Sequence, residues 1–247
     1  MFFNYFSELY KNKVPLFIAY DSESELNNVI DIVKKDNPEL KNAEILISDI
    51  IGENEFVKYI NIRIKFTLDL KDYDVVIPAI ILKVIFMLDI EGYRTLNDES
   101  QSIFEEAGVL GMYGIKDIGK LESINNRIAK SSLFGYDPHP NIINKAASLW
   151  VEIAQNQVFH NGNKRTAMLA ALLYLRSNFY DFTMQVPKGI PPEKNILYMV
   201  SMKIARHEIG VSEVEEFIKK HVSLDVNLMR IYNDEYVNTG KEGEVNG

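Results

Sequence analysis

The chain has 247 residues, of which 47% are hydrophobic and 25% are charged, and its formal net charge is −8. A chain of this kind can bury a sizeable core, and its negative charge argues against direct nucleic-acid binding through bulk electrostatics. The absence of cysteine excludes a disulfide framework, a thiolate zinc site and a cysteine nucleophile. The N-terminus lacks the pattern of a signal peptide, and no apolar run is long enough to cross a membrane. We therefore expect a cytoplasmic protein that does not bind membranes.

Residues 1–95 have the pattern of a small α/β region. Asp21 or Ser22 can cap a helix that carries apolar residues at helical spacing as far as Val33. We also predict a helix at 75–88, because this stretch is the most apolar of the chain. Three further stretches predict strands, because they are apolar or have apolar residues at every second position: residues 14–20, 43–51 and 59–68. No motif in this region gives it a role, and we interpret its acidic residues as a solvated face.

Residues 96–225 have an almost wholly helical pattern. Asn141 should cap a helix with an apolar face, and the stretch 167–175 is apolar nearly all round, which predicts a central buried helix. Ser212-Glu213-Val214-Glu215 has the pattern of a capping box before the last helix. Other helices are expected at residues 98–106, 120–129 and 191–206, and loops at 108–119 and 131–140. Residues 226–247 form a C-terminal extension, whose end we expect to be disordered.

The stretch from Gln157 to Ala167 joins two of these helices. An Asn-Gly pair at 161–162 readily adopts the left-handed backbone of an anion-binding nest. Lys164 and Arg165 follow, at the start of the apolar helix, where free N–H groups and the helix dipole also favour an anion. The residues therefore predict a site for phosphate or carboxylate. The alternative is that the two cations are only a solvated pair at a helix start.

Phe159 and the run Asn163-Lys164-Arg165-Thr166-Ala167 resemble the Fic/Doc superfamily, and specifically its death-on-curing (Doc) branch. The Gly-rich stretch 111–119 and the turn at 208–214 also resemble Doc toxins, so the resemblance covers about residues 100–222. It implies a Fic/Doc-type helical bundle at 96–225, and hence a mainly α protein with a small α/β N-terminal part. It also implies transfer of a phosphoryl or nucleoside monophosphate group from ATP, or another nucleoside triphosphate, to a protein hydroxyl.

The family pattern places a general-base His first and then an acidic residue that holds Mg²⁺ on the nucleotide. This chain departs from the pattern at both positions. Gln157 stands at the His position and cannot accept a proton at neutral pH, and Asn161 stands at the acidic position and would bind Mg²⁺ more weakly. The positions that the resemblance assigns to phosphate binding are kept: Gly162, Asn163, Lys164 and Arg165.

Two residues of the motif have open roles. His160 could be a displaced general base or a loop histidine that points elsewhere, and we expect the second, because three residues along a turn change its direction. Thr166 is either a hydrogen-bonding residue at the helix start or a ligand group. The remaining histidines are isolated in the sequence and are expected to be structural or on the surface: His139, His207 and His221.

Two functional hypotheses stay open. The retained Asn163, Lys164 and Arg165 favour a divergent transferase, for which the resemblance implies a protein target, with a translation factor as one candidate, and an antitoxin partner. The departures at Gln157 and Asn161 favour a catalytically inactive Fic/Doc-fold protein that acts as a protein-binding or regulatory module. A third interpretation is that Gln157 replaces a His by engineering, to inactivate a toxic protein.

Overall fold

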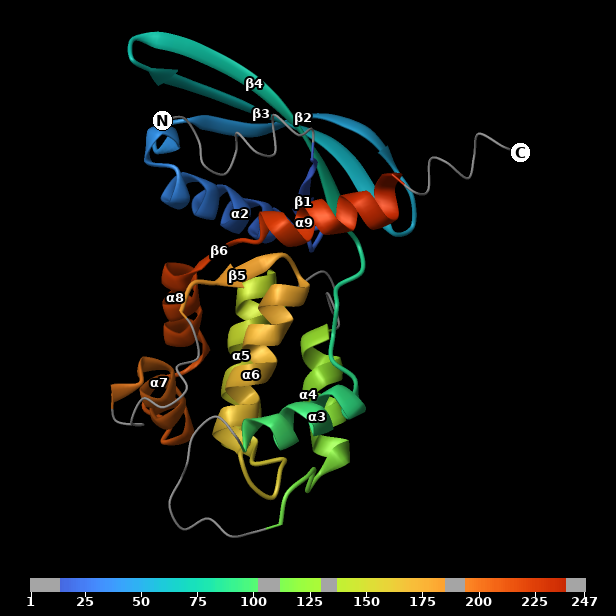
Figure 1. Ribbon diagram of the computed structural model, residues 1–247, viewed down its shortest axis with the longest axis vertical. Helices are drawn as coiled ribbons and strands as arrows, with labels where there is room; N and C mark the ends of the chain where they lie inside the picture. The colour runs from blue at the N-terminus through green and yellow to red at the C-terminus, as the bar shows by residue number, and fades with distance from the viewer. Residues whose placement is uncertain (1–13, 102–111, 130–136, 185–193, 239–247) are drawn as a thin grey trace, which may run out of the picture. The chain divides into compact units, whose positions relative to one another are not determined.

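The computed structural model describes residues 14–101, 112–129, 137–184 and 194–238 (Figure 1). The chain divides into two compact units. The first comprises residues 1–85, 178–181 and 223–247, and the second comprises residues 86–177 and 182–222. The division falls after Ile85, and the first unit includes two later segments of the chain. Within the described ranges, no helix has the length and apolar character needed to cross a membrane.

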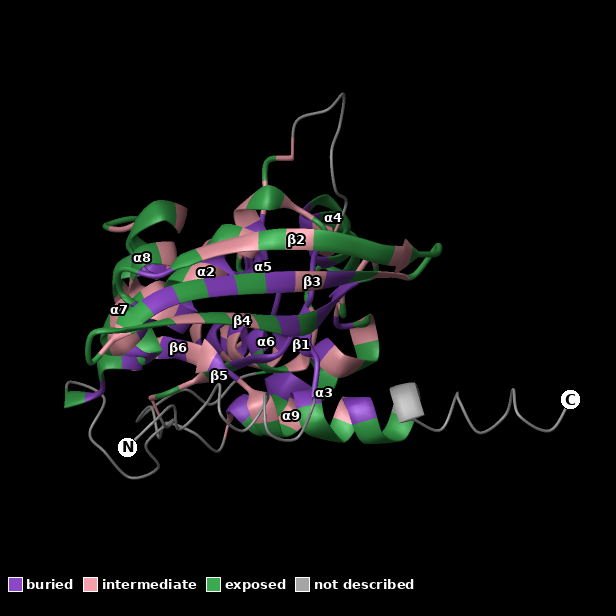
Figure 2. Ribbon diagram, turned by 90° about the horizontal axis from the view of Figure 1, so that it is seen from above, coloured by how far each residue is buried: buried purple, intermediate pink, exposed green. Residues whose placement is uncertain are grey.

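A four-stranded sheet forms the centre of the first unit. Its strands are β1 (Leu16–Ile18), β2 (Glu44–Glu53), β3 (Val57–Leu68) and β4 (Lys71–Leu82), in the order β1-β4-β3-β2. Only β1 and β4 pair in parallel, whereas the other two pairs are antiparallel. Every second residue of β3 from Ile60 to Phe66 is buried, as its period-two pattern predicts (Figure 2).

Helix α2 (Glu23–Asp36) covers one face of this sheet. Its cap is Ser22, whose hydroxyl accepts a hydrogen bond from the Glu25 N–H at 3.0 Å, as the sequence predicted for one of two candidates. Val29 and Val33 of α2 line a small apolar cavity together with Ile62 of β3, so the helix contacts the sheet through its apolar side.

The prediction of a helix at 75–88 is wrong, because most of this stretch belongs to β4. β4 lies between β1 and β3, and Ala79, Ile80 and Ile81 are all buried. A strand buried on both faces appears in the sequence as a continuous apolar run, which periodicity does not separate from a buried helix. Pro78 lies one residue before the part of β4 that β1 pairs, so the parallel ladder begins after the proline.

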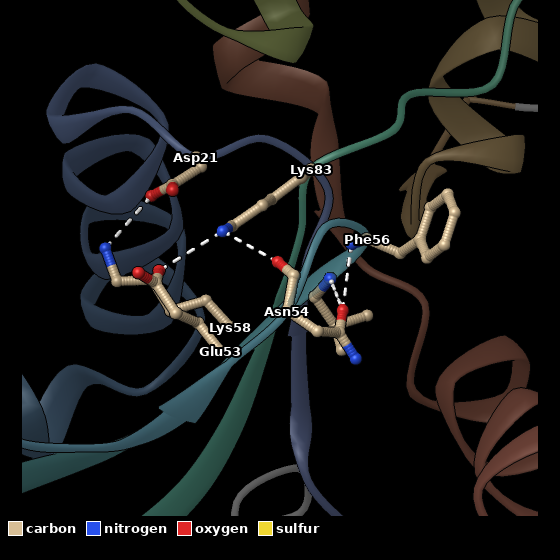
Figure 3. Close-up of polar contacts among 7 residues, drawn as sticks. Asp21, Glu53, Asn54, Phe56, Lys58 and Lys83 are labelled. Carbon is tan, nitrogen blue, oxygen red and sulfur yellow. Dashed lines mark hydrogen bonds and ion pairs between the residues drawn. The ribbon is translucent and has the colours of Figure 1, made fainter.

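The turn between β2 and β3 is fixed by side chains from two parts of the chain (Figure 3). Asn54 Oδ1 accepts a hydrogen bond from the Phe56 N–H at 2.8 Å, which closes the turn locally. Lys83, just after β4, donates to the Asn54 carbonyl oxygen at 2.9 Å and lies 3.2 Å from the Glu53 carboxylate. The end of β4 therefore holds the turn that begins β3.

The C-terminal part of the described chain completes the first unit. Helix α9 (Val226–Tyr232) continues into η3, a π-helix at Asn233–Asn238. The Tyr232 ring lies 5.5 Å from the rings of Phe17 in β1 and Phe179, and those two rings are 5.1 Å apart. The extension expected at 226–247 therefore begins as a packed helix, and its last nine residues lie outside the described ranges.

The second unit consists mainly of helices. They are α3 (Ile90–Ser100), α4 (Ile118–Ala129), α5 (Ile142–Asn156), α6 (Asn163–Ser177), α7 (Ile196–Ala205) and α8 (Val211–His221). α5 and α6 lie side by side at its centre (Figure 1). Trp150 of α5 and Tyr174 of α6 are fully buried, which confirms the predicted central helix. Asn141 caps α5 as predicted, since its side chain accepts a hydrogen bond from the Asn144 N–H at 2.8 Å.

Three helix starts differ from the prediction. α3 begins at Ile90, eight residues before the predicted start, because Asp89 caps it by accepting a hydrogen bond from the Gly92 N–H at 2.7 Å. α7 begins after Asn195, and the prolines expected to start it lie outside the described residues. α8 begins at Val211, and its capping contact joins the Gly210 N–H to the Glu213 carboxylate at 3.0 Å, so Ser212 is not its cap.

A second, two-stranded sheet joins β5 (Tyr180–Phe182) and β6 (Val222–Leu224). The chain passes from one unit to the other within these two short strands.

Candidate functional site

The motif forms the connection from α5 to α6 and lines a pocket of about 260 Å³. α5 ends at Asn156, and Gln157 turns the chain with left-handed dihedrals, φ 49° and ψ 52°. Gly162, directly before α6, also has a positive φ of 75°. All but one of the predicted site residues line the pocket, whose lining comprises Ala154, Gln157, His160, Asn161, Gly162, Asn163, Lys164, Arg165 and Ala205.

The Asn163 side chain holds the loop closed. Its Oδ1 accepts a hydrogen bond from the Phe159 N–H at 2.8 Å, and its Nδ2 donates to the Phe159 carbonyl oxygen at 2.9 Å. An amide nitrogen carries two hydrogens, so one remains for a ligand. Asn163 therefore has a structural role in addition to the phosphate-binding role that the resemblance assigns to it.

The Gly-rich segment lies beside the motif. Phe159 is buried and forms a β-bridge with Ile115. On either side of this bridge, the His160 N–H donates to the Gly114 carbonyl oxygen at 3.0 Å and the Lys116 N–H donates to the Val158 carbonyl oxygen at 2.7 Å. The described part of the segment thus fixes the backbone of the loop that carries the site.

The pocket has a positive electrostatic character. Arg165 is only 5% exposed, and its Nη2 donates to Gln101 Oε1 at 3.0 Å. Its burial contradicts the alternative of a solvated cation pair. Lys164 Nζ lies 3.1 Å from Met202 Sδ on α7, and the first turn of α6 supplies the positive end of its dipole. Among the described residues that line the pocket, none is acidic, so the site suits an anion.

Gln157 and His160 are both exposed, and both line the pocket. His160 thus lines the same pocket as Lys164 and Arg165. The backbone bond from the His160 N–H to Gly114 fixes the residue at the edge of the loop. The pocket thus has a histidine in its lining, although Gln157 occupies the usual His position.

The described residues do not fit a magnesium site. The pocket lining contains no carboxylate, and no group of three or more metal-ligating side chains occurs in the ranges that the structure describes. Asn161 Oδ1 accepts a hydrogen bond from the Gly162 N–H at 2.7 Å. Asn161 Nδ2 is buried without a hydrogen-bond partner, and an N–H donor does not bind a cation. The described residues of the pocket therefore supply no carboxylate ligand for the metal that the resemblance implies.

Thr166 contacts two residues of α3, Asn97 and Ser100. Thr166 is fully buried, and its hydroxyl accepts a hydrogen bond from Asn97 Nδ2 at 2.9 Å, so it does not line the pocket. Asn97 and Gln101 were not predicted from the sequence, because each lies 64 residues before its partner in the motif and forms no recognisable pattern with it. No local signal would have found them.

His139 has the structural role that was expected. Its Nδ1 lies 3.1 Å from Asn144 Oδ1 and 3.1 Å from Ser148 Oγ, away from the pocket lining. Burial lowers the pKa of His139 from its ordinary value.

Comparison with known proteins agrees with this geometry. Residues 88–175, which run from before α3 almost to the end of α6, match the model of the Fic/DOC family. Over 110 residues the chain is 34% identical to "Protein kinase doc" of Escherichia phage P1, and this match covers 44% of the chain and 79% of that protein. The chain belongs to the Fic/Doc family. The resemblance seen in the sequence is thereby confirmed, as is the mainly α fold with a smaller α/β portion.

A second relative matches over a shorter stretch. This Fic/Doc chain is 35% identical over 68 residues to "Toxin Doc" of Mycolicibacterium smegmatis. The matched stretch covers 28% of the chain. The chain spans about half of that toxin's length, 52%. The family match begins after the four-stranded sheet, so the sheet of the first unit lies outside it.

Proposed function

We propose that this Fic/Doc protein binds the phosphates of a nucleoside triphosphate in the motif pocket and transfers a phosphoryl or nucleoside monophosphate group to a protein hydroxyl. The observation that carries the proposal is a pocket lined by Lys164 and the buried Arg165 at the N-terminus of α6, without a carboxylate among its described residues. Two cations and a helix N-terminus favour a polyanion such as a triphosphate.

In the proposed reaction, the pocket residues act on the target hydroxyl and on the bound phosphates. The oxygen of the target hydroxyl forms a bond to phosphorus, and the bond from phosphorus to the leaving oxygen breaks. Transfer of the γ-phosphoryl group releases a nucleoside diphosphate, and transfer of the nucleoside monophosphate releases pyrophosphate. His160 takes the proton of the hydroxyl, Gln157 orients that hydroxyl, and Arg165 and Lys164 stabilise the negative charge on the phosphate oxygens.

The names of the two relatives favour one form of this function. One relative is a protein kinase and the other is a toxin, which favours phosphoryl transfer within a toxin–antitoxin pair. We accordingly propose a protein target, with a translation factor as one candidate, and an antitoxin partner.

A second candidate is a Fic/Doc-fold binding module without transferase activity. It is favoured by Gln157 at the position of the usual His and by the absence of a described carboxylate for magnesium. In this case the pocket still binds nucleotide phosphates, but the function depends on a protein that the bound form recognises.

Label transfer distinguishes these candidates. The protein is incubated with bacterial lysate, magnesium and ATP labelled at the α- or γ-phosphate, beside its Arg165→Ala and Arg176→Ala variants. Arg176 is an exposed arginine at the opposite end of α6, so its variant is the matched control. A γ-labelled band that disappears only in Arg165→Ala supports phosphoryl transfer, and an α-labelled band supports nucleotidyl transfer. ATP binding without any band supports the binding module, and failure to bind ATP refutes both.

A further inference from the structure

Three polar residues near the C-terminal end of α3 lie against the motif loop. We name Asn97, Ser100 and Gln101 the α3 clasp. Asn97 and Ser100 are fully buried, and none of the three lines the pocket. Buried polar side chains on a helix are costly unless they are hydrogen-bonded, so their contacts show what the clasp holds in place.

Asn97 uses both ends of its amide to join three segments. Its Nδ2 donates to the Asn161 carbonyl oxygen at 2.9 Å and to Thr166 Oγ1 at 2.9 Å. Its Oδ1 accepts from the Gly114 N–H at 3.0 Å. Asn97 thus connects the motif loop, the first turn of α6 and the Gly-rich segment through one side chain.

Gln101 extends the clasp to the guanidinium of Arg165. Its Oε1 accepts from Arg165 Nη2 at 3.0 Å, and its Nε2 donates to the Asn97 carbonyl oxygen at 2.8 Å. The amide therefore has a fixed orientation, which in turn fixes the direction of the guanidinium. Arg165 is thus held by the residue that caps the C-terminal end of α3.

The approach of the loop to the clasp leaves no room for a side chain at Gly162. A Cβ atom built there would lie 2.9 Å from Ser100 Oγ, 2.9 Å from Gln101 Nε2 and 3.2 Å from Asn97 Nδ2. These distances are below ordinary van der Waals contact. The clasp and the glycine are therefore complementary parts of one close contact.

We infer that the α3 clasp positions the motif loop and Arg165 for anion binding, and that Asn97 is its principal positioning residue. The inference rests on the proposed function, because it concerns the same pocket. Asn97 acts through the loop and not on the ligand. Its removal should weaken phosphate binding even though the cations that bind phosphate remain.

Calorimetric titration with ATP tests this inference on the full chain. Asn97→Ala should raise the Kd for ATP at least tenfold. Asn37→Ala is the matched control, because Asn37 is also a buried asparagine, with its Nδ2 donating to the Val33 carbonyl oxygen at 2.7 Å, but it lies in the first unit. Both variants should lose thermal stability, whereas only Asn97→Ala should lose affinity.

A double-mutant cycle separates positioning from general destabilisation. If Asn97 acts by orienting Arg165, then Arg165→Ala should weaken ATP binding much less in the Asn97→Ala background than in the wild-type chain. Additive effects of the two substitutions would overturn the inference. If Asn97→Ala does not fold, Thr166→Val replaces it in the cycle, because it removes the hydroxyl that Asn97 holds and leaves the pocket lining unchanged.

The two proposals fail in different ways. If the wild-type chain binds no ATP, the proposed function is refuted and the clasp has nothing to position. If the wild-type chain binds ATP and a folded Asn97→Ala variant binds it equally well, the clasp inference alone is refuted.

Discussion

Replacing Arg165 by alanine is the most direct test of the pocket. Arg165 is 5% exposed and lines the pocket, and its Nη2 donates a hydrogen bond to Gln101 Oε1 at 3.0 Å. An arginine guanidinium binds phosphate oxygens through charge-assisted hydrogen bonds. Hydrogen bonds to charged groups contribute about 1.5–3 kcal/mol each, and 1.4 kcal/mol is about tenfold in affinity. Loss of one such bond should raise the Kd for ATP by about 10- to 150-fold.

Isothermal titration calorimetry at fixed salt measures this change. Arg176→Ala removes the same charge at the exposed end of the same helix, so it should leave the Kd nearly unchanged. Arg165→Lys keeps the charge but not the planar group that reaches Gln101, and we expect an intermediate affinity. The reasoning would be refuted by a folded Arg165→Ala variant that binds ATP with the affinity of the wild-type chain.

The other predictions concern catalysis, folding and pH. His160→Ala should reduce label transfer by about 100- to 10,000-fold if the imidazole is the general base. Gln157→His should raise label transfer at least about tenfold. An unchanged rate in the Gln157→His variant would mean that residue 157 does not face the target hydroxyl. Asn163→Ala removes both hydrogen bonds to the Phe159 backbone and should lower the free energy of unfolding by about 1–3 kcal/mol, as urea denaturation would show; an unaltered midpoint would contradict the structural role. Because burial holds the pKa of His139 below its unfolded value, the unfolded chain binds the proton more readily. Stability should therefore fall as the pH drops below about 6.5, with a smaller slope in His139→Gln.

The sequence predicted those features that depend on local patterns. Alternating isoleucines placed β3, and Asn141 placed the start of α5. The motif identified the connection before α6 and nearly every residue of its pocket. In each case the interactions that determine the local structure join residues close together in the sequence, so the residue pattern is enough to predict that structure.

The features that the sequence did not predict depend on distant contacts. The run at 75–88 became a strand because β1 and β3 lie on its two sides. Asn97 is recognisable as part of the site only when its side chain meets Thr166, 69 residues later. The backbone of the motif loop likewise depends on a contact with a distant part of the sequence, the bridge between Ile115 and Phe159. Such interactions have no fixed spacing in a sequence and become visible only in the fold.

The aromatic contacts of Phe17 have a consequence for the order in which the protein folds during synthesis. Phe17 in β1 is synthesised early. The two residues whose rings pack on it, Phe179 and Tyr232, are synthesised only after helices α3 to α6. The first unit therefore cannot complete its core on the ribosome until almost the entire chain has emerged, whereas domains made of one continuous segment fold as they appear. Residues 1–85 produced alone should expose the apolar side of β1 and aggregate, and adding a separate peptide that contains α9 should reduce this aggregation.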